Sequence, residues 1–464
     1  MAYQIEEIEV KPENPYAHDL LDRKPIVDFL SGLIERLHGP FVLSLDSPFG
    51  TGKTTLVKML MEDLKKKEFH CIYFNAWEVD YVTDPLVALV SFFDDIDLEN
   101  GDTGDAYREK FESVKKFANH IVKRGAVIGT KVVTAGFVDI DKELKQYNSE
   151  FSDDEDNISG IDIVDAFTKQ RGLMEKFRSE LEDAIKNLPT ANGSHNLVIF
   201  IDELDRCRPT FALELLERVK HLFNIPNIIF VLSIDKAQLE TSIKSIYGDG
   251  TQSAEYLQRF IHLEYSIPPT SSVSCTEALI TRFYLDSRFE ERSENRETQY
   301  DKEHFVEFFT AIADIFELTI RARERCITRL CVVLDQTPSN HYLDPTIVAL
   351  LTVLRTKNMD LYQKLVNGEK SPDDVMEILT SQPLKDKLLS DRQKHMLHAY
   401  LILMDPSEGR TTVKIKRLKE RFDGEGDSYS GDLLQMIVDI KRSSRAIPSL
   451  TQAADKIDLA SGVR

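Results

Sequence analysis

The chain has 464 residues, a length that allows two to four domains at ~100–200 residues each. Hydrophobic residues make up 42% and charged residues 29%, so the chain can bury a core and is not globally disordered. Its 58 Lys and Arg residues stand against 78 Asp and Glu residues, which gives a formal net charge of −20. This charge repels a phosphate polyanion, so a nucleic-acid partner is expected only if a local basic patch binds it.

Cysteine usage and the lack of long apolar segments favour a cytoplasmic protein. The cysteines are scattered and form no CxxC pair, which disfavours a disulfide framework and a zinc cluster. They are Cys71, Cys207, Cys275, Cys326 and Cys331. The first residues, MAYQIEEIEVKPENP, lack the basic and apolar regions of a signal peptide. No stretch of ~20 apolar residues occurs, so we expect no transmembrane span.

Strand candidates alternate with helical patterns up to about residue 268. Short, nearly continuous apolar runs are typical of parallel strands buried on both faces. The candidates are Phe41–Asp46, Cys71–Asn75, Leu197–Asp202, Ile228–Ile234 and the weaker His262–Ile267. Helical patterns lie between them, for example over Thr54–Lys67 and Ala212–Phe223. Residues 1–268 are therefore predicted to form an α/β domain with a central parallel sheet flanked by helices.

An insertion is predicted over residues 94–165. Between the second and third predicted strands lie about 120 residues, whereas a βαβ crossover needs ~30. Two acidic runs, Asp94–Asp105 and Glu150–Asp165, are predicted to be solvated linkers on either side of a basic stretch, Lys115–Val138. That stretch contains GAVIGTKVVTAGFV, which is too short to cross a bilayer. It is either a helix or mobile arm packed on protein, or a segment for peripheral membrane contact or partner docking.

Residues 269–464 are predicted to form a helical lid followed by a helical domain. Apolar residues recur at helical spacing in four segments. These are His304–Phe316, Ala322–Leu334, Pro345–Leu354 and Leu384–Met404. Asp423–Gly431 is predicted to be a flexible loop from its Gly, Ser and Asp content. Lys414–Arg421 is strongly basic and is either a solvated helix face or a patch for nucleic acid or an acidic partner.

The strongest motif is SPFGTGKTT at residues 47–55, between the first strand and a helix. This is the setting of a phosphate-binding P-loop, although Ser47 stands where the first glycine is usual. Lys53 would reach the β- and γ-phosphates, and the Thr54 hydroxyl would hold Mg²⁺. The plain alternative is a glycine-rich turn. The residues expected to contact a nucleotide are Phe49, Gly50, Thr51, Gly52, Lys53, Thr54 and Thr55.

A second motif, LVIFIDELDRCRP, begins at Leu197. Its apolar run places Asp202 at the end of a buried strand, expected next to the first strand, where it would ligate Mg²⁺ or hold the ion's water. Glu203 could polarise the attacking water as a general base. Acidic residues at a helix N-terminus are the plain alternative. Arg206, with Asp205, forms either a surface ion pair or a cation at the γ-phosphate or a subunit interface.

Two more residues have open alternatives. Asp235 ends the strand in NIIFVLSIDK, where it either senses the terminal phosphate or caps the following helix. Trp77, the single tryptophan, follows the second strand, where it either packs in the core or orders the loop above the nucleotide.

From about Asn14 to Leu334 the chain resembles the KAP family of P-loop NTPases, which includes phage-exclusion proteins. The resemblance lies in LLDRKPIVDFLSGLI, FGTGKTTL, YFNAWE, IDELDRCRP, FVLSIDKAQLETSIKSIYG, YLQRFIHLEYSIP and LTIRARERC. Phe49 stands where the family usually has Trp, and Arg259 where it usually has Lys. The resemblance implies Mg-ATP binding and hydrolysis, with Arg321 or Arg325 approaching the nucleotide from the helical lid.

The sequence thus predicts an ATP-driven switch that transfers the γ-phosphoryl group to water. A homo-oligomer and a separate effector chain are the expected partners, and resemblance to phage-exclusion relatives implies a setting in antiviral defence. Arg206 or Arg259 would serve a neighbouring subunit. The rival interpretations are a scaffold that binds nucleotide without turnover and a P-loop kinase for a small acceptor. A DNA-translocating motor is disfavoured by the net charge.

Overall fold

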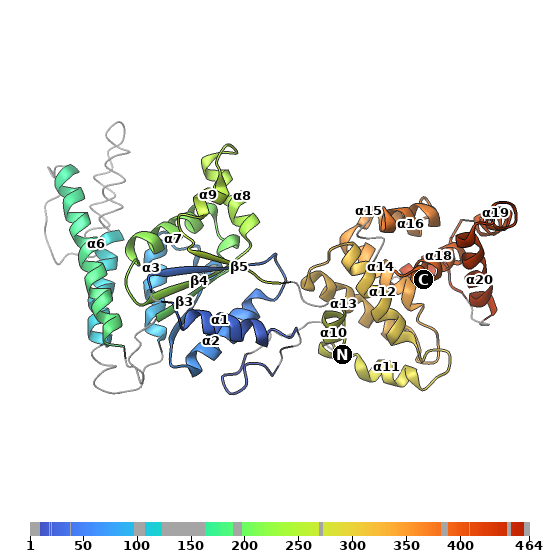
Figure 1. The fold of residues 1–464 in the computed structure, drawn as a ribbon, viewed down its shortest axis with the longest axis horizontal. Coiled ribbons are helices and arrows are strands. Elements are labelled where there is room, and N and C mark those ends of the chain that lie inside the picture. Colours follow the sequence, from blue (N-terminus) through green and yellow to red (C-terminus); the bar gives the residue numbers. More distant parts are fainter. Residues whose placement is uncertain are drawn as a thin grey trace.

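The computed structural model describes residues 10–17, 19, 21–37, 39–96, 107–122, 163–188, 197–268, 272–381, 388–407, 409–442 and 447–458. They form two lobes that lie end to end (Figure 1). An α/β lobe extends to Pro268, and a helical lobe begins at Ser272.

The α/β lobe is built on a five-stranded parallel sheet in the order β2-β3-β4-β1-β5. Its strands are β1 (Phe41–Asp46), β2 (His70–Asn75), β3 (Leu197–Asp202), β4 (Ile228–Ile234) and β5 (Leu263–Ser266). The predicted parallel sheet is therefore confirmed, to within one residue at each strand end. The expectation that the strand ending in Asp202 lies beside β1 is wrong, because β4 pairs with both strands and separates them.

Alternating side chains of the strands supply two cores, one on each face of the sheet. On one face, Leu43 and Val231 pack against α1 (Lys24–Ile34) and α2 (Lys53–Lys66). On the other face, Phe74 and Phe230 pack against helices on that side. Those helices are α3 (Pro85–Ser91), α6 (Ile163–Lys186), α7 (Pro209–Leu222), α8 (Lys236–Tyr247), α9 (Ser253–Leu257) and a helix over residues 107–122.

Aromatic contacts join described parts of the segment between β2 and β3 to the α/β lobe. Phe93 stacks on Phe111 with ring centroids 5.2 Å apart, and Phe177 meets Phe223 edge-on at 5.7 Å. Most of the two acidic runs and the segment GAVIGTKVVTAGFV lie outside the described residues. Among the helices of the described ranges, none has the length and apolar character needed to cross a membrane.

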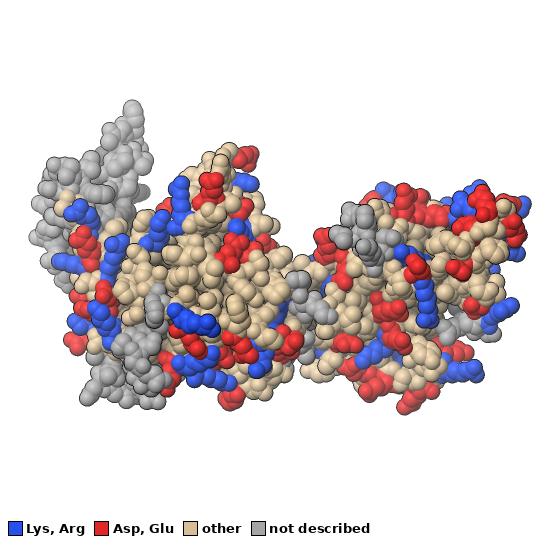
Figure 2. Space-filling view, in the orientation of Figure 1, with Lys and Arg blue, Asp and Glu red and all other residues tan. Residues whose placement is uncertain are grey.

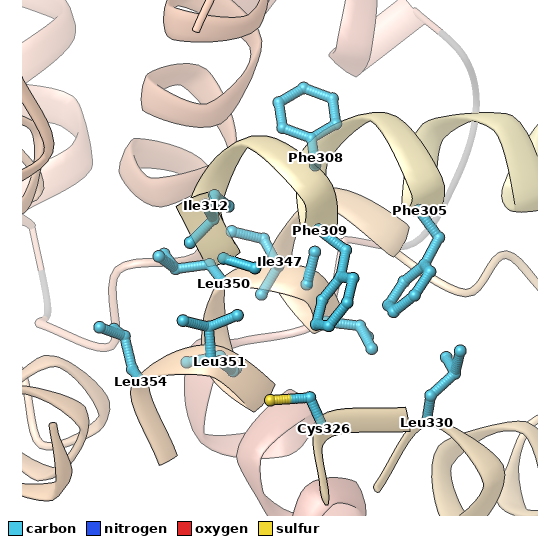
Figure 3. Close-up of a cluster of buried hydrophobic side chains, with 14 of the residues drawn as sticks. Phe305, Phe308, Phe309, Ile312, Cys326, Leu330, Ile347, Leu350, Leu351 and Leu354 are labelled. Atoms are coloured by element: carbon cyan, nitrogen blue, oxygen red, sulfur yellow. The ribbon is translucent and has the colours of Figure 1, made fainter. Parts of the chain in front are cut away.

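The helical lobe has its own core, formed chiefly by α12 (Asp301–Ile315), α13 (Ile320–Gln336) and α14 (Pro345–Lys357). Phe305, Phe309, Leu330 and Leu351 are fully buried there (Figure 3). The other helices are α10 (Ser272–Arg282), α11 (Asp286–Ser293), α15 (Met359–Val366), α16 (Pro372–Thr380), α18 (Asp391–Met404), α19 (Arg410–Glu425), α20 (Ser428–Arg442) and α21 (Leu450–Ile457).

Two predictions for this lobe are wrong in their boundaries. The helix predicted from Leu384 begins only at Asp391, where Ser390 and Gln393 form a capping box; residues 384–387 lie outside the described part. The loop predicted over Asp423–Gly431 is almost entirely helical, because α19 continues to Glu425 and α20 begins at Ser428. Gly431 lies in a close packing contact and not in a turn, because a Cβ at this position would lie 2.6 Å from the ring of Phe422.

Helix α19 carries the basic segment Lys414–Arg421. Lys414 pairs with Asp373 of α16, and Lys416 lies 3.8 Å from Glu420. On the face shown in Figure 2, acidic and basic side chains are interspersed over both lobes, α19 and α20 included. The interpretation of this segment as a binding patch stays a prediction.

Candidate functional site

A cleft of about 680 Å³ lies where the P-loop and the end of β3 meet the helical lobe. This volume falls within the range that small-molecule sites occupy. The P-loop contributes Lys53 and Thr54, the segment after β3 contributes Glu203, and the helical lobe contributes Leu279 and Arg321. Because parallel strands end at the same edge of a sheet, the motifs at residues 47–55 and 197–209 converge here as their strand contexts predict.

The P-loop begins at Ser47, where the usual first glycine is replaced. The Ser47 amide donates to the carbonyl of Ile234, and its hydroxyl lies 2.6 Å from that of Thr51. Thr51 also donates to the carbonyl of Pro48 at 2.9 Å, so these hydroxyls close the loop from within. Gly50 and Gly52 have φ values of +73° and +84°, a region that a residue with a Cβ enters only with strain. Thr51 itself stabilises the loop and does not line the cleft.

Lys53 is the first residue of α2 and its side chain lies inside the loop. Its ammonium donates to the carbonyl of Ser47 and lies 5.3 Å from the ring centre of Phe49. Burial lowers the pKa of Lys53, and the carboxylates of Asp205, Asp235 and Asp202 act against this shift in that order. The loop therefore holds a cation at the positive end of a helix, which is the arrangement that binds phosphate.

Asp202 is 1% exposed and its orientation is set by hydrogen bonds to both oxygens. Oδ1 accepts from the amide of Glu203 at 2.9 Å, and Oδ2 accepts from the hydroxyl of Tyr73 at 3.0 Å. Burial raises the pKa of the Tyr73 phenol, and the Asp202 carboxylate adds to this shift. Tyr73 remains a donor to Asp202 at neutral pH. The contact of Tyr73 with Asp202 could not be predicted from the sequence, because a tyrosine within an apolar run indicates only a strand residue.

Glu203 is held by an ion pair that Arg206 makes inside an aromatic stack. The Arg206 Nη1 lies 2.7 Å from Glu203 Oε1. The guanidinium carbon is 5.2 Å from the Phe49 ring centre and 5.5 Å from that of Trp77. Burial raises the pKa of Glu203, while Arg206 and then Arg321 act to lower it. Trp77 is 51% exposed, so the alternative that it packs in the core is wrong.

Asp205 lies in the same cleft and sequence reasoning gave it no role beyond an ion pair. It is 8% exposed, and neither carboxylate oxygen has a side-chain hydrogen-bond partner among the described residues. Burial raises its pKa to about 6, although the Lys53 ammonium acts to lower it. Asp205 therefore supplies the largest single attraction acting on Lys53, at the cost of a poorly solvated carboxylate.

Replacement of Asp205 by Asn should stabilise the protein at neutral pH but not in acid. A folded-state pKa of about 6, against the ordinary 3.8, means that the folded protein holds this proton more tightly. The stability that the protonated group contributes is full below about pH 4 and is lost as pH rises through 6. The loss is at most about 3 kcal/mol at ~1.4 kcal/mol per pKa unit. Urea unfolding of the wild type and of Asp205→Asn at pH 4 and pH 7.5 measures this loss of stability. The prediction would be contradicted if the two proteins differed in free energy of unfolding by the same amount at both pH values.

The cleft wall on the helical lobe includes Arg321, the second residue of α13. Thr319 caps this helix by accepting from the Ala322 amide. A Cβ at Gly50 would lie 3.0 Å from the Arg321 Cβ, so the tip of the P-loop lies directly against α13. Arg325, one turn further on, is exposed and outside the residues that line the cleft.

Two other predicted residues also lie outside the cleft lining. Asp235 caps α8 by accepting from the Gln238 amide at 3.4 Å, which is the plain one of its two predicted roles. Arg259 follows α9, is exposed, and lies 5.5 Å from the ring centre of Tyr256. The role toward a neighbouring subunit that the sequence predicts for Arg259 stays a prediction.

The oxygen donors in the cleft fit Mg²⁺. Thr54 offers a hydroxyl, and Asp202 and the under-coordinated Asp205 offer carboxylates. These are the hard ligands that Mg²⁺ prefers, and the ion ordinarily takes one or two carboxylates together with phosphate and water oxygens. Within the described ranges, no group of three or more His, Cys, Asp and Glu residues is placed to hold a metal unaided. A bound ion would thus complete its shell from phosphate and water.

Comparisons with known proteins agree with this geometry. Residues 23–337 match the KAP family P-loop domain. A stretch of 177 residues, 36% of this chain, is 28% identical to an uncharacterized protein of Methanocaldococcus jannaschii and covers 90% of it. The family match takes in both lobes as far as the end of α13, and with them every residue that lines the cleft from Arg23 onward. The chain therefore belongs to the KAP family of P-loop NTPases, which indicates that the cleft binds a nucleotide.

Proposed function

We propose that the protein binds and hydrolyses Mg-ATP and that its nucleotide state controls assembly or the engagement of a partner. The observation that carries this proposal is the meeting of Lys53 with Asp202 and Glu203 in one cleft. A phosphate-binding cation, a Mg²⁺ ligand and a general base are the groups that phosphoryl transfer to water requires. The family membership supports nucleotide hydrolysis in general.

Each residue has a part that follows from its position. The amides of the P-loop and the Lys53 ammonium would bind the β- and γ-phosphates, while Thr54 and Asp202 would hold Mg²⁺. The ion, when bound, neutralises charge on the phosphate oxygens. Glu203 would orient a water and accept its proton; its raised pKa brings it closer to the operating pH, where a base works best. The ion pair with Arg206 engages the Oε1 atom of Glu203.

A role as a switch is supported by the composition of the cleft walls. One wall belongs to the sheet lobe and the other, through Leu279, Arg282 and Arg321, to the helical lobe. A ligand that contacts both walls binds best to one arrangement of the lobes and so shifts their equilibrium. ATP has a γ-phosphate that its hydrolysis product ADP lacks, and Arg321 would face this phosphate.

The test is phosphate release from Mg-ATP by the purified protein with no acceptor present, together with titration of a fluorescent ATP analogue. We expect saturable binding and slow turnover. Binding without turnover would favour the scaffold alternative, and turnover only after addition of a small acceptor would favour a P-loop kinase. Failure to bind any nucleotide would contradict the proposal.

The proposal extends to a homo-oligomer, a separate effector chain and a setting in defence against phage. The phage setting is supported only by the motifs shared with phage-exclusion members of the family. Plaque counts on host cells that carry the wild-type gene, with its natural neighbours, or its Lys53→Ala form test the setting. Equal counts would contradict it, and analytical ultracentrifugation with and without Mg-ATP tests assembly.

Arg321→Ala should slow turnover about tenfold or more at every protein concentration, because Arg321 lies in the cleft of its own chain. Arg259→Ala should instead remove any dependence of specific activity on protein concentration, because Arg259 is exposed and lies outside the residues that line the cleft of its own chain. Arg325→Ala is the comparison for Arg321, since it removes the same charge one turn further along α13, outside the cleft. Specific activity that stays flat across a hundredfold dilution of the wild type would count against an arginine acting between subunits.

A further inference from the structure

The segment before α1 lies between the P-loop and the helical lobe. The Asp19 carboxylate accepts from the amides of Arg23 and Lys24 at 2.8 and 2.9 Å, which ties Asp19 to the start of α1. Leu21 packs against the core of the helical lobe, and its Cδ1 lies 3.5 Å from where a Cβ of Gly52 would be. One short segment thus contacts both the nucleotide-binding loop and the second lobe.

Arg23 makes the polar part of this contact. Its side chain is buried, and its two terminal nitrogens donate to carbonyls that are far apart in the sequence. Nη2 donates to Thr51 in the P-loop and Nη1 to Pro268 just beyond β5, each at 3.1 Å. The chain continues from Pro268 into the helical lobe. Arg23 therefore joins the loop that would hold phosphate to the point where the sheet lobe ends.

Burying this guanidinium is costly, and the cost is only partly offset. Burial lowers the pKa of Arg23, the nearby Asp19 carboxylate acts against this, and Nε has no partner among the described residues. Hydrogen bonds from a charged donor are stronger than those between neutral groups. A leucine or methionine would fill the space without desolvating a charge. What the arginine adds is a fixed geometry between two backbone segments.

We propose that Arg23 is a positioning residue that sets the shape of the P-loop and the placement of the helical lobe together. This inference rests on the proposed function, because it assigns the Arg23 contacts to the regulation of the nucleotide cleft. The Lys53 ammonium donates to the Ser47 carbonyl within the loop. A bound phosphate competes for that ammonium, so the loop would readjust, and the Thr51 carbonyl would carry the change through Arg23 to Pro268.

The test measures the distance between the lobes by double electron–electron resonance. Spin labels are placed on Lys244→Cys in α8 and Glu377→Cys in α16, both exposed, in a Cys71→Ser background because the other native cysteines are buried. Arg23→Met keeps an unbranched side chain and removes both donors. Arg23→Lys keeps the charge but can reach only one carbonyl well. Lys24→Met is the matched control, since it removes a neighbouring exposed cation that pairs with Asp28 and lies over the ring of Tyr16.

We expect Arg23→Met to broaden the distance distribution of the nucleotide-free protein, and Arg23→Lys to broaden it less. We also expect Arg23→Met to weaken binding of a non-hydrolysable ATP analogue about tenfold and to lose the shift in distance that this analogue causes in the wild type. Lys24→Met should match the wild type in each measurement. If Arg23→Met does not fold, as circular dichroism would show, Arg23→Lys carries the test alone.

Two results would overturn the inference. One is a wild-type distance distribution in both Arg23 variants, whatever their affinity, because Arg23 would then be only a ligand contact. The other is a wild-type protein that binds the analogue with no change in distance. Failure of the proposed function is separate: the wild type would bind no nucleotide, and the nucleotide-free distributions would still decide whether Arg23 places the lobes.

Discussion

Replacement of Lys53 by Ala is expected to reduce the affinity for Mg-ATP by about 100-fold or more and to abolish measurable turnover, because the P-loop lysine is the main protein cation on the β- and γ-phosphates. The effect should be large because Lys53 is buried and lies beside several carboxylates. Without its ammonium, Asp205 and Asp202 would leave the cleft negative and would repel phosphate. Titration of a fluorescent ATP analogue measures the affinity, and phosphate release measures turnover.

The control is Lys66→Ala, which removes a cation from the last turn of the same helix, α2, where the side chain is exposed. Circular dichroism of both variants excludes unfolding as the cause of lost binding. Hydrolysis at the wild-type rate by purified Lys53→Ala protein would contradict the assignment of residues 47–55 as the phosphate-binding loop.

Most of the sheet could be predicted because its central strands are short and mostly apolar. Every residue of β3 and β4 is buried, so the sequence of each strand records burial on both faces. The order of the strands could not be predicted in the same way. β3 and β4 are both continuous apolar runs, and nothing in them determines which one pairs with β1. The position of β4 between β1 and β3 follows only from the packing of the whole sheet.

The cleft could be predicted where its residues follow strand ends, and not where they come from other segments. Lys53, Asp202 and Glu203 sit at positions that a parallel sheet brings to one edge. Tyr73 and Arg23 reach the cleft through tertiary contacts whose partners are distant in the sequence, such as Arg23 with Pro268. For Arg23 the only local signal was its place before Pro25, at the start of a helix.

Glycines in the sequence of α19 and α20 wrongly predicted a loop in this part of the chain. Glycines at Gly424, Gly426 and Gly431 suggested one continuous loop. Only Gly426 adopts a left-handed φ, of +64°, and it ends α19. Gly431 is helical because the ring of Phe422 lies where a side chain would be. A glycine selected for close packing and a glycine selected for a turn look alike in the sequence.

Glu203→Gln should lower the turnover of ATP by about 10²–10⁴-fold, the usual contribution of a general base, while ATP still binds. Glutamine has nearly the same shape but accepts no proton at neutral pH, so the nucleotide should persist in the cleft.

The matched control for Glu203→Gln is Glu214→Gln. Like Glu203, Glu214 pairs with an arginine, Arg218, at 3.3 Å, but it lies outside the residues that line the cleft. The Glu214→Gln protein should therefore turn over ATP at the wild-type rate.

Because burial raises the pKa of Glu203, the acidic limb of the wild-type pH–rate profile should lie above the ordinary glutamate value of 4.5. Single-turnover hydrolysis with tightly bound radiolabelled ATP separates loss of chemistry from loss of binding. A Glu203→Gln protein that turns over ATP like the wild type would show that another group activates the water, and Asp205, with its pKa of about 6, would be the next residue to replace.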